Sequence, residues 1–171
     1  GHTRWATHGV PAEHNAHLHL SMNGDFVVVH NGIVENYLEL REELSAEGVE
    51  FRSETDTEVI VQLIERFAHN GAEGNLIEAT HKAVKLLRGA HAIVILSKNQ
   101  PDTLIAVRIG NAGGLAIGIG DDETYIASDI PAILEHTRQM VFLESRQMAV
   151  VRAGEFTVET LDAEPVDTEI H

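Results

Sequence analysis

The spacing of apolar residues divides the chain into a helical part and a strand-rich part. Between residues 33 and 89, apolar positions recur every three or four residues, which predicts amphipathic helices. The first helix is expected to end at Gly48, and the second to begin with a capping box formed by Thr55 and Glu58. The predicted helices span residues 33–48, 55–71 and 75–89.

Outside this region the apolar residues fall in short runs rich in β-branched side chains. Residues 26–30 (FVVVH) predict a buried strand that ends at Asn31-Gly32. A short helix over about residues 130–135, with Asp129 as its cap, is expected between later strands. These later strands are predicted at residues 90–97, 103–109, 113–120, 123–128, 140–144, 148–153 and 155–161.

This order of elements predicts the fold class and the domain limits. Helices followed by a run of strands are typical of an α+β layered domain with largely antiparallel sheets. We expect this domain to cover residues 1–160. The acidic tail over residues 161–171 resembles a linker or a frayed end.

Composition narrows the classes of partner. The formal net charge is −15 and the basic residues are scattered, so neither nucleic acid nor an anionic membrane surface is an expected partner. No run approaches the roughly 20 apolar residues of a membrane span. The chain has no cysteine, which excludes disulfides, thiolate metal sites and a cysteine nucleophile within these 171 residues. A cytoplasmic location is compatible with this absence.

Histidine is frequent near the start of the chain and raises the question of a metal site. His14, His17 and His19, with Glu13 or Asp25, have donor atoms suited to zinc. However, no metal-binding signature of established spacing is present, and we expect His17 and His19 on opposite faces of a strand. We therefore expect hydrogen-bonding roles and no metal, with a histidine-based metal hydrolase as an alternative.

Three separate signals point to a free amino acid as ligand. Arg4 has a planar guanidinium suited to a carboxylate, and Asp56 is suited to an ammonium group, although an acid near a helix start also stabilises the helix dipole. Asn31-Gly32 reads either as a simple turn or as two donors that converge on one oxyanion. One amino-acid ligand would explain all of these features.

Four motifs, taken in order, carry a resemblance to a known family. HTRWATHG, NAHLH, VVVHNGIVEN and SETDTEVI together resemble the glutaminase half of the glucosamine-6-phosphate synthase family. The resemblance covers nearly the whole chain. It implies a four-layer α/β/β/α sandwich of two antiparallel sheets, which is the fold of the N-terminal-nucleophile amidotransferases.

The resemblance also implies an activity and partners. Such enzymes hydrolyse L-glutamine with an N-terminal cysteine whose α-amino group acts as the base. The ammonia passes to a sugar-isomerase domain of the same full-length chain, which converts fructose 6-phosphate to glucosamine 6-phosphate in amino-sugar biosynthesis. No cofactor is implied, and the full-length protein is expected to be a homo-oligomer.

Residue roles follow from the same resemblance. Arg4 is expected to bind the α-carboxylate of glutamine and Asp56 its α-ammonium group, while Asn31 and Gly32 would form the oxyanion hole. The remaining motif residues are expected in a loop over glutamine (Trp5, Thr7 and His8) and in supporting positions (His17 and His30).

The chain departs from this family in one respect. In the family, the nucleophilic cysteine lies well before the TRWATHG motif. The present sequence begins at that motif and holds no cysteine. We therefore expect a domain truncated at its N-terminus, inactive alone and prone to self-association through exposed strand edges. A non-catalytic amino-acid-binding module that keeps Arg4 and Asp56 is one alternative, and the glutaminase domain of another type 2 amidotransferase is a second.

Overall fold

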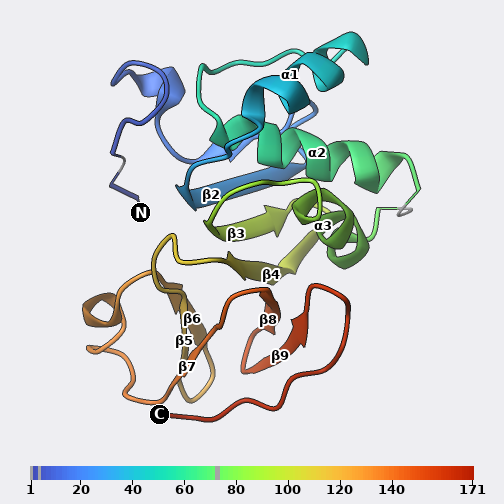
Figure 1. The fold of residues 1–171 in the computed structure, drawn as a ribbon. Helices are drawn as coiled ribbons and strands as arrows, with labels where there is room; N and C mark the ends of the chain where they lie inside the picture. Colours follow the sequence, from blue (N-terminus) through green and yellow to red (C-terminus); the bar gives the residue numbers. More distant parts are fainter. Residues whose placement is uncertain (1, 4, 72–73) are drawn as a thin grey trace.

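Helices cover one side of a large sheet and a small sheet lies on the other side (Figure 1). The computed structural model describes residues 2–3, 5–71 and 74–171. The helices are α1 (Tyr37–Ala46), α2 (Thr57–His69) and α3 (Leu76–Val84), with 3-10 turns at Glu13–Asn15 and Ile130–Ala132. The strands are β1 (His19–Leu20), β2 (Phe26–Gly32), β3 (His91–Ser97), β4 (Gln100–Ile109), β5 (Ala116–Ile119), β6 (Thr124–Ala127), β7 (Met140–Phe142), β8 (Gln147–Arg152) and β9 (Glu155–Thr160).

Both sheets are antiparallel throughout, as the sequence predicts. The large sheet has the strand order β1-β2-β3-β4-β8-β9, and the small sheet has the order β6-β5-β7. Every named strand pair is antiparallel. The seven strands predicted after residue 89 are all present, because alternating apolar residues and turn residues mark them strongly.

The alternation of side chains along β4 shows how the layers pack. Ile105 and Val107 point into the core beneath the helices, whereas Ala106 joins a second core shared with Ile117 of the small sheet. The large sheet is therefore buried on both faces. Ile133, beyond the second 3-10 turn, packs on the outer face of the small sheet. The predicted α+β sandwich of two antiparallel sheets is confirmed, and the outer layer over the small sheet is this short turn segment.

The start of α2 differs from the predicted capping box. The helix begins at Thr57 with Asp56 at the N-cap, and no side chain caps it there. Glu58 instead accepts hydrogen bonds from the backbone N–H groups of Arg52 and Ser53. The prediction is wrong because the preceding segment folds over the helix start, so that its own buried amides take up the carboxylate.

Asn31 and Gly32 are the last two residues of β2 and not a turn that follows it. Both residues continue the strand and pair with β3, Asn31 opposite Ala92 and Gly32 opposite His91. The predicted turn is wrong because pairing with a neighbouring strand outweighs the local preference of Asn-Gly for a turn. The two residues therefore have positions fixed by the sheet rather than by a loop.

All three helices are shorter than the sequence predicts. The first helix begins at Tyr37 rather than residue 33, because Val34 and Glu35 donate their amides to Asp56 and to the carbonyl of Arg88. The third ends at Val84, although its N-cap is formed by Asn75, as its place in the sequence suggests. Asp129 precedes a 3-10 turn and makes no side-chain cap bond.

The tail over residues 161–171 lies along both sheets instead of fraying. Val166 donates its amide to Val158, and His171 exchanges two backbone hydrogen bonds with Met140 of β7. Leu161 is buried in the main core. The sequence does not show this, because acidic residues that alternate with isolated apolar ones are equally common in solvated segments.

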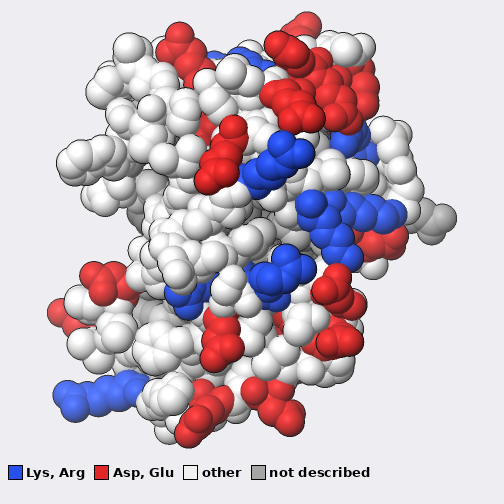
Figure 2. Space-filling view, viewed as in Figure 1, with Lys and Arg blue, Asp and Glu red and all other residues white. Residues whose placement is uncertain are grey.

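Acidic side chains gather over α1 on the face shown in Figure 2, and lysine and arginine lie among acids elsewhere on that face. Within residues 2–3, 5–71 and 74–171, no helix is both long and apolar enough to cross a bilayer.

Candidate functional site

A cavity of about 300 Å³ lies where β2 ends and α2 begins. Its walls come from the N-terminal segment, from the end of β2 and from the segment that leads into α2. Most of the motif residues singled out in the sequence therefore meet here, although they are far apart along the chain. The lining residues are His2, Thr3, Trp5, Thr7, His17, His30, Asn31, Gly32, Ile33, Thr55, Asp56 and Thr57.

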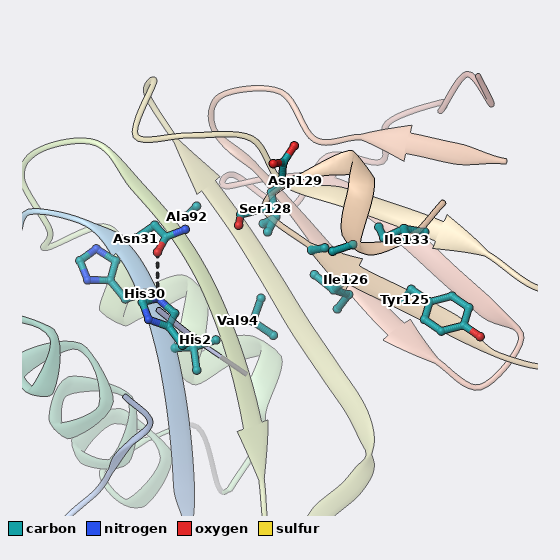
Figure 3. Close-up of a pocket in the computed structure, with 14 residues that line it drawn as sticks. His2, His30, Asn31, Ala92, Val94, Tyr125, Ile126, Ser128, Asp129 and Ile133 are labelled. Atoms are coloured by element: carbon teal, nitrogen blue, oxygen red, sulfur yellow. Dashed lines mark hydrogen bonds between the residues drawn. The ribbon is translucent and has the colours of Figure 1, made fainter. Parts of the chain in front are cut away.

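A second cavity of about 330 Å³ adjoins the first and lies between the two sheets (Figure 3). The two cavities share His2, His30 and Asn31, so the end of β2 separates them. Its other walls are largely apolar, with Val94 on one side and Ile133 on the other. The polar chemistry is thus concentrated in the cavity next to α2.

Asn31 is oriented by a hydrogen bond to the N-terminal segment. Its Oδ1 lies 2.9 Å from Nε2 of His2. A carbonyl oxygen only accepts, so His2 carries the proton on Nε2. This bond uses the acceptor end of the Asn31 amide. The nitrogen end points away from His2 (Figure 3). Asn31 therefore presents a donor at the boundary of the two cavities.

Gly32 follows Asn31 in β2 and has a positive φ angle, which favours glycine. Its φ is +132°, and a Cβ on it would overlap the carbonyl oxygen of Ala90 and lie 3.0 Å from Nε2 of His30. The close approach of β2 to the segment before β3 therefore depends on the absence of a side chain. This packing fixes the backbone of Gly32, which lines the cavity together with Asn31.

Asp56 supplies the charged group of the cavity. Its side chain is almost fully buried, and its Oδ2 accepts the backbone N–H of Val34 at 2.7 Å. Its Oδ1 lies 3.6 Å from Nδ1 of His8. One carboxylate oxygen is thus held by the main chain, while the other faces the segment that closes the cavity.

The TRWATHG segment forms the outer wall. Trp5 is 89% exposed, and His8 packs edge-on against Tyr37 with ring centroids 4.7 Å apart. Thr7 lines the cavity with Trp5. Arg4, the predicted carboxylate ligand, lies outside the described residues. The structure therefore places Trp5 and Thr7 in the cavity wall and His8 beside Asp56, which also lines the cavity.

The histidines near the cavity form ring contacts and hydrogen bonds. His17 stacks on His2 with centroids 3.8 Å apart and lies edge-on to His19 at 5.1 Å. The predicted placement of His17 and His19 on opposite faces is wrong, since residues two apart in an extended chain point to the same side. Across the parts of the chain with described coordinates, no group of three or more His, Cys, Asp or Glu side chains is arranged to hold a metal.

His30 lies deeper, behind Gly32. Its Nδ1 is 3.0 Å from Oγ1 of Thr57, and its Nε2 is 3.1 Å from Nδ1 of His91. Burial, and then the charge of neighbouring histidines, lowers the pKa of His30 well below 6.5; burial also lowers the pKa of His91. Both rings are therefore neutral at physiological pH.

Sequence reasoning missed His2, Thr55, Thr57 and His91 as parts of this site. Thr55 and Thr57 flank Asp56 within the same motif, which was the available signal. His91 carries no such signal, because only the register between β2 and β3 places it opposite Gly32.

The motif segments also hold one another in place. Asn15, from NAHLH, donates to Glu54 of SETDTE at 3.2 Å and accepts the Glu54 backbone N–H at 2.9 Å. His19 lies 3.2 Å from Oγ1 of Thr55. These buried or half-buried contacts join the N-terminal segment to the start of α2, and so define one side of the cavity.

Two antiparallel sheets packed face to face, with helices on the outer side of the large sheet, define the fold of the N-terminal-nucleophile glutamine amidotransferases. Among solved structures, the chain is similar to a glutamine phosphoribosylpyrophosphate amidotransferase from B. subtilis, with a TM-score of 0.76 and 25% identity over 96% of this chain and 35% of that one. It is also similar to an allosteric regulatory enzyme of purine biosynthesis, with a TM-score of 0.67 and 27% identity over 85% of this chain and 30% of that one.

The sequence model described as a glutamine amidotransferase domain matches residues 2–135, and the chain belongs to this family. It is 48% identical over 170 residues to the glutamine–fructose-6-phosphate aminotransferase (isomerizing) of Aquifex aeolicus, and 45% identical over 170 residues to that of Methanothermobacter thermautotrophicus. Each match covers 99% of this chain and 28% of the relative. The chain thus spans little more than a quarter of these relatives.

Proposed function

We propose that this chain is the glutamine-binding part of a glutamine-dependent aminotransferase that makes glucosamine 6-phosphate from fructose 6-phosphate. The observation that carries the proposal is that Asp56, Asn31 and Gly32 line one cavity. The sequence similarity to the two aminotransferases supports the sugar acceptor. In this proposal residues 1–160 form the glutaminase domain, and residues 161–171 begin the connection to a sugar-isomerase domain.

In this cavity the α-ammonium group of L-glutamine pairs with Asp56, whose Oδ1 is directed toward the closing segment. The α-carboxylate is assigned to Arg4 from the resemblance, with Trp5, Thr7 and His8 over the ligand. Recognition of both charged ends fixes the orientation of a free amino acid.

The side-chain amide carbon of glutamine is then attacked by a thiolate, and its oxygen becomes negatively charged. The Asn31 amide and the Gly32 N–H donate hydrogen bonds to this oxygen and stabilise the tetrahedral intermediate. As the intermediate collapses, the amide nitrogen takes up the proton that the thiol gave to its base and leaves as ammonia, and water then releases glutamate from the thioester. The attacking thiol belongs to no residue of this sequence, since it holds no cysteine.

Steady-state glutamine hydrolysis by the full-length protein that carries this chain tests the proposal. We expect Asp56→Asn to raise KM for glutamine at least tenfold, because the ammonium group loses its charged partner, and Asn31→Ala to lower kcat about 100-fold. Exposed Asp121→Asn is the matched control for charge. Binding of L-glutamine without hydrolysis by the full-length protein would contradict the proposal and support a non-catalytic amino-acid-binding module.

The 171-residue chain alone gives a second test. We expect it to release no ammonia from glutamine, because the attacking atom is absent from its composition. Ammonia release above a buffer blank, measured with a coupled dehydrogenase, would show that another residue acts as the nucleophile.

A further inference from the structure

Three buried side chains form a hydrogen-bonded chain directly behind Gly32. Thr57 Oγ1 lies 3.0 Å from His30 Nδ1, His30 Nε2 lies 3.1 Å from His91 Nδ1, and His91 Nε2 lies 3.1 Å from the carbonyl oxygen of Arg88. Thr57, His30 and His91 are each at most 4% exposed. This row of hydrogen-bonded side chains connects α2, which carries Thr57, with β2, which carries His30, and β3, which carries His91.

The far end of this chain fixes the direction of every proton in it. The carbonyl oxygen of Arg88 only accepts, so His91 carries its proton on Nε2. Neutral His91 then offers a lone pair on Nδ1, and His30 must donate from Nε2. The Nδ1 of His30 is left as an acceptor for the Thr57 hydroxyl. All three bonds are satisfied by one set of tautomers.

The charged and titratable neighbours favour this neutral arrangement. Burial is the main cause of the lowered pKa of His30, and the neighbouring rings of His91, His17, His2 and His19 lower it further. Asp56 and Glu35 act on His91 in the opposite direction, but burial outweighs them and the pKa of His91 is lowered. Protonation of either His30 or His91 to an imidazolium is thus opposed by the desolvation of the charged ring.

The position of this chain connects it with the proposed reaction. His91 is the cross-strand partner of Gly32, and the Nε2 of His30 lies against the place where a Gly32 Cβ would project. At the other end, Thr57 follows Asp56 at the first turn of α2. The chain therefore ties the strand end with the proposed oxyanion donors to the helix start with the proposed ammonium acceptor.

We propose that His91 is a positioning residue for this active site: by accepting the His30 Nε2–H it selects one tautomer of His30, and it thereby holds Gly32 at the distance from Asp56 that the tetrahedral intermediate requires. This inference rests on the proposed glutaminase function. His91 touches no substrate atom in this role, and it acts through His30.

The test compares His91→Phe with His91→Asn in the full-length protein. Phenylalanine keeps a planar ring but removes both nitrogens, whereas the Oδ1 of asparagine can replace the Nδ1 acceptor. We expect His91→Phe to lower kcat for glutamine hydrolysis at least tenfold with KM changed less than threefold, because a misplaced oxyanion donor affects the transition state most. We expect His91→Asn to restore kcat to within about threefold of the wild type, since the acceptor is retained.

Thermal melting of the same variants separates positioning from simple destabilisation. If kcat of the two variants follows their melting temperatures instead of the presence of an acceptor, or if His91→Phe keeps the wild-type kcat, the positioning role is wrong. If the wild-type protein hydrolyses no glutamine, the proposed function itself fails, and the inference fails with it. Catalytic loss in His91→Phe with rescue in His91→Asn supports the inference.

Discussion

Gly32→Ala is the substitution that best tests the geometry of the strand end. Gly32 has a φ of +132°, a region that only glycine adopts without strain, and a Cβ there would overlap the carbonyl oxygen of Ala90. Backbone strain of this kind costs about 1–3 kcal/mol. Relief of the overlap requires β2 to move away from the segment before β3 and weakens the terminal ladder bonds, each worth about 1 kcal/mol.

We therefore expect Gly32→Ala to lower the free energy of unfolding by about 3–5 kcal/mol. Gly24→Ala is the matched control, because Gly24 also has a positive φ, +74°, but a Cβ there would meet no atom within 4 Å. The control should lose only about 1–2 kcal/mol from its left-handed backbone. The difference between the two variants isolates the contact with Ala90.

Equilibrium urea unfolding followed by far-ultraviolet circular dichroism measures both variants under the same conditions. A Gly32→Ala protein within 1 kcal/mol of Gly24→Ala would refute the reasoning, since the close packing against Ala90 would then make no contribution.

Two further predictions concern buried polar groups. Because the pKa values of His30 and His91 are lowered in the folded protein, the unfolded chain binds protons below pH 6.5 that the folded chain does not. The free energy of unfolding should therefore fall from pH 7 toward pH 5.5, by at most about 1.4 kcal/mol per pH unit for each histidine. Urea unfolding across this range checks it, with a shallower slope in His91→Asn; an unchanged slope would contradict the assignment. Glu58→Gln should destabilise the protein by about 2–4 kcal/mol, because the carboxylate accepts the Ser53 N–H in a buried site, whereas the exposed control Glu47→Gln should change stability by less than about 1 kcal/mol. Equal thermal shifts in the two variants would argue against a buried anchor.

Local patterns were sufficient to predict the elements and most of the site. Helical spacing in residues 55–71 and alternation in the later strands identify α2 and β3–β9, because burial of one face imposes those periods on the sequence. The SETDTE and HNG motifs also identify Asp56, Asn31 and Gly32, since their chemistry is visible in the residue types.

How these residues meet depends on contacts between segments that are far apart in the sequence. The sequence suggests a turn at Asn31-Gly32, but pairing with β3 continues the strand and places His91 opposite Gly32. It likewise suggests a capping box for Glu58, whose carboxylate instead binds the amides of the preceding segment. The physical reason is common to both cases: a backbone amide takes whichever partner the fold brings within reach, and the local residue types do not show which partner that is. Residue patterns along the chain therefore predict the elements and the candidate chemistry, whereas the packing of β2, β3 and α2 brings the site together.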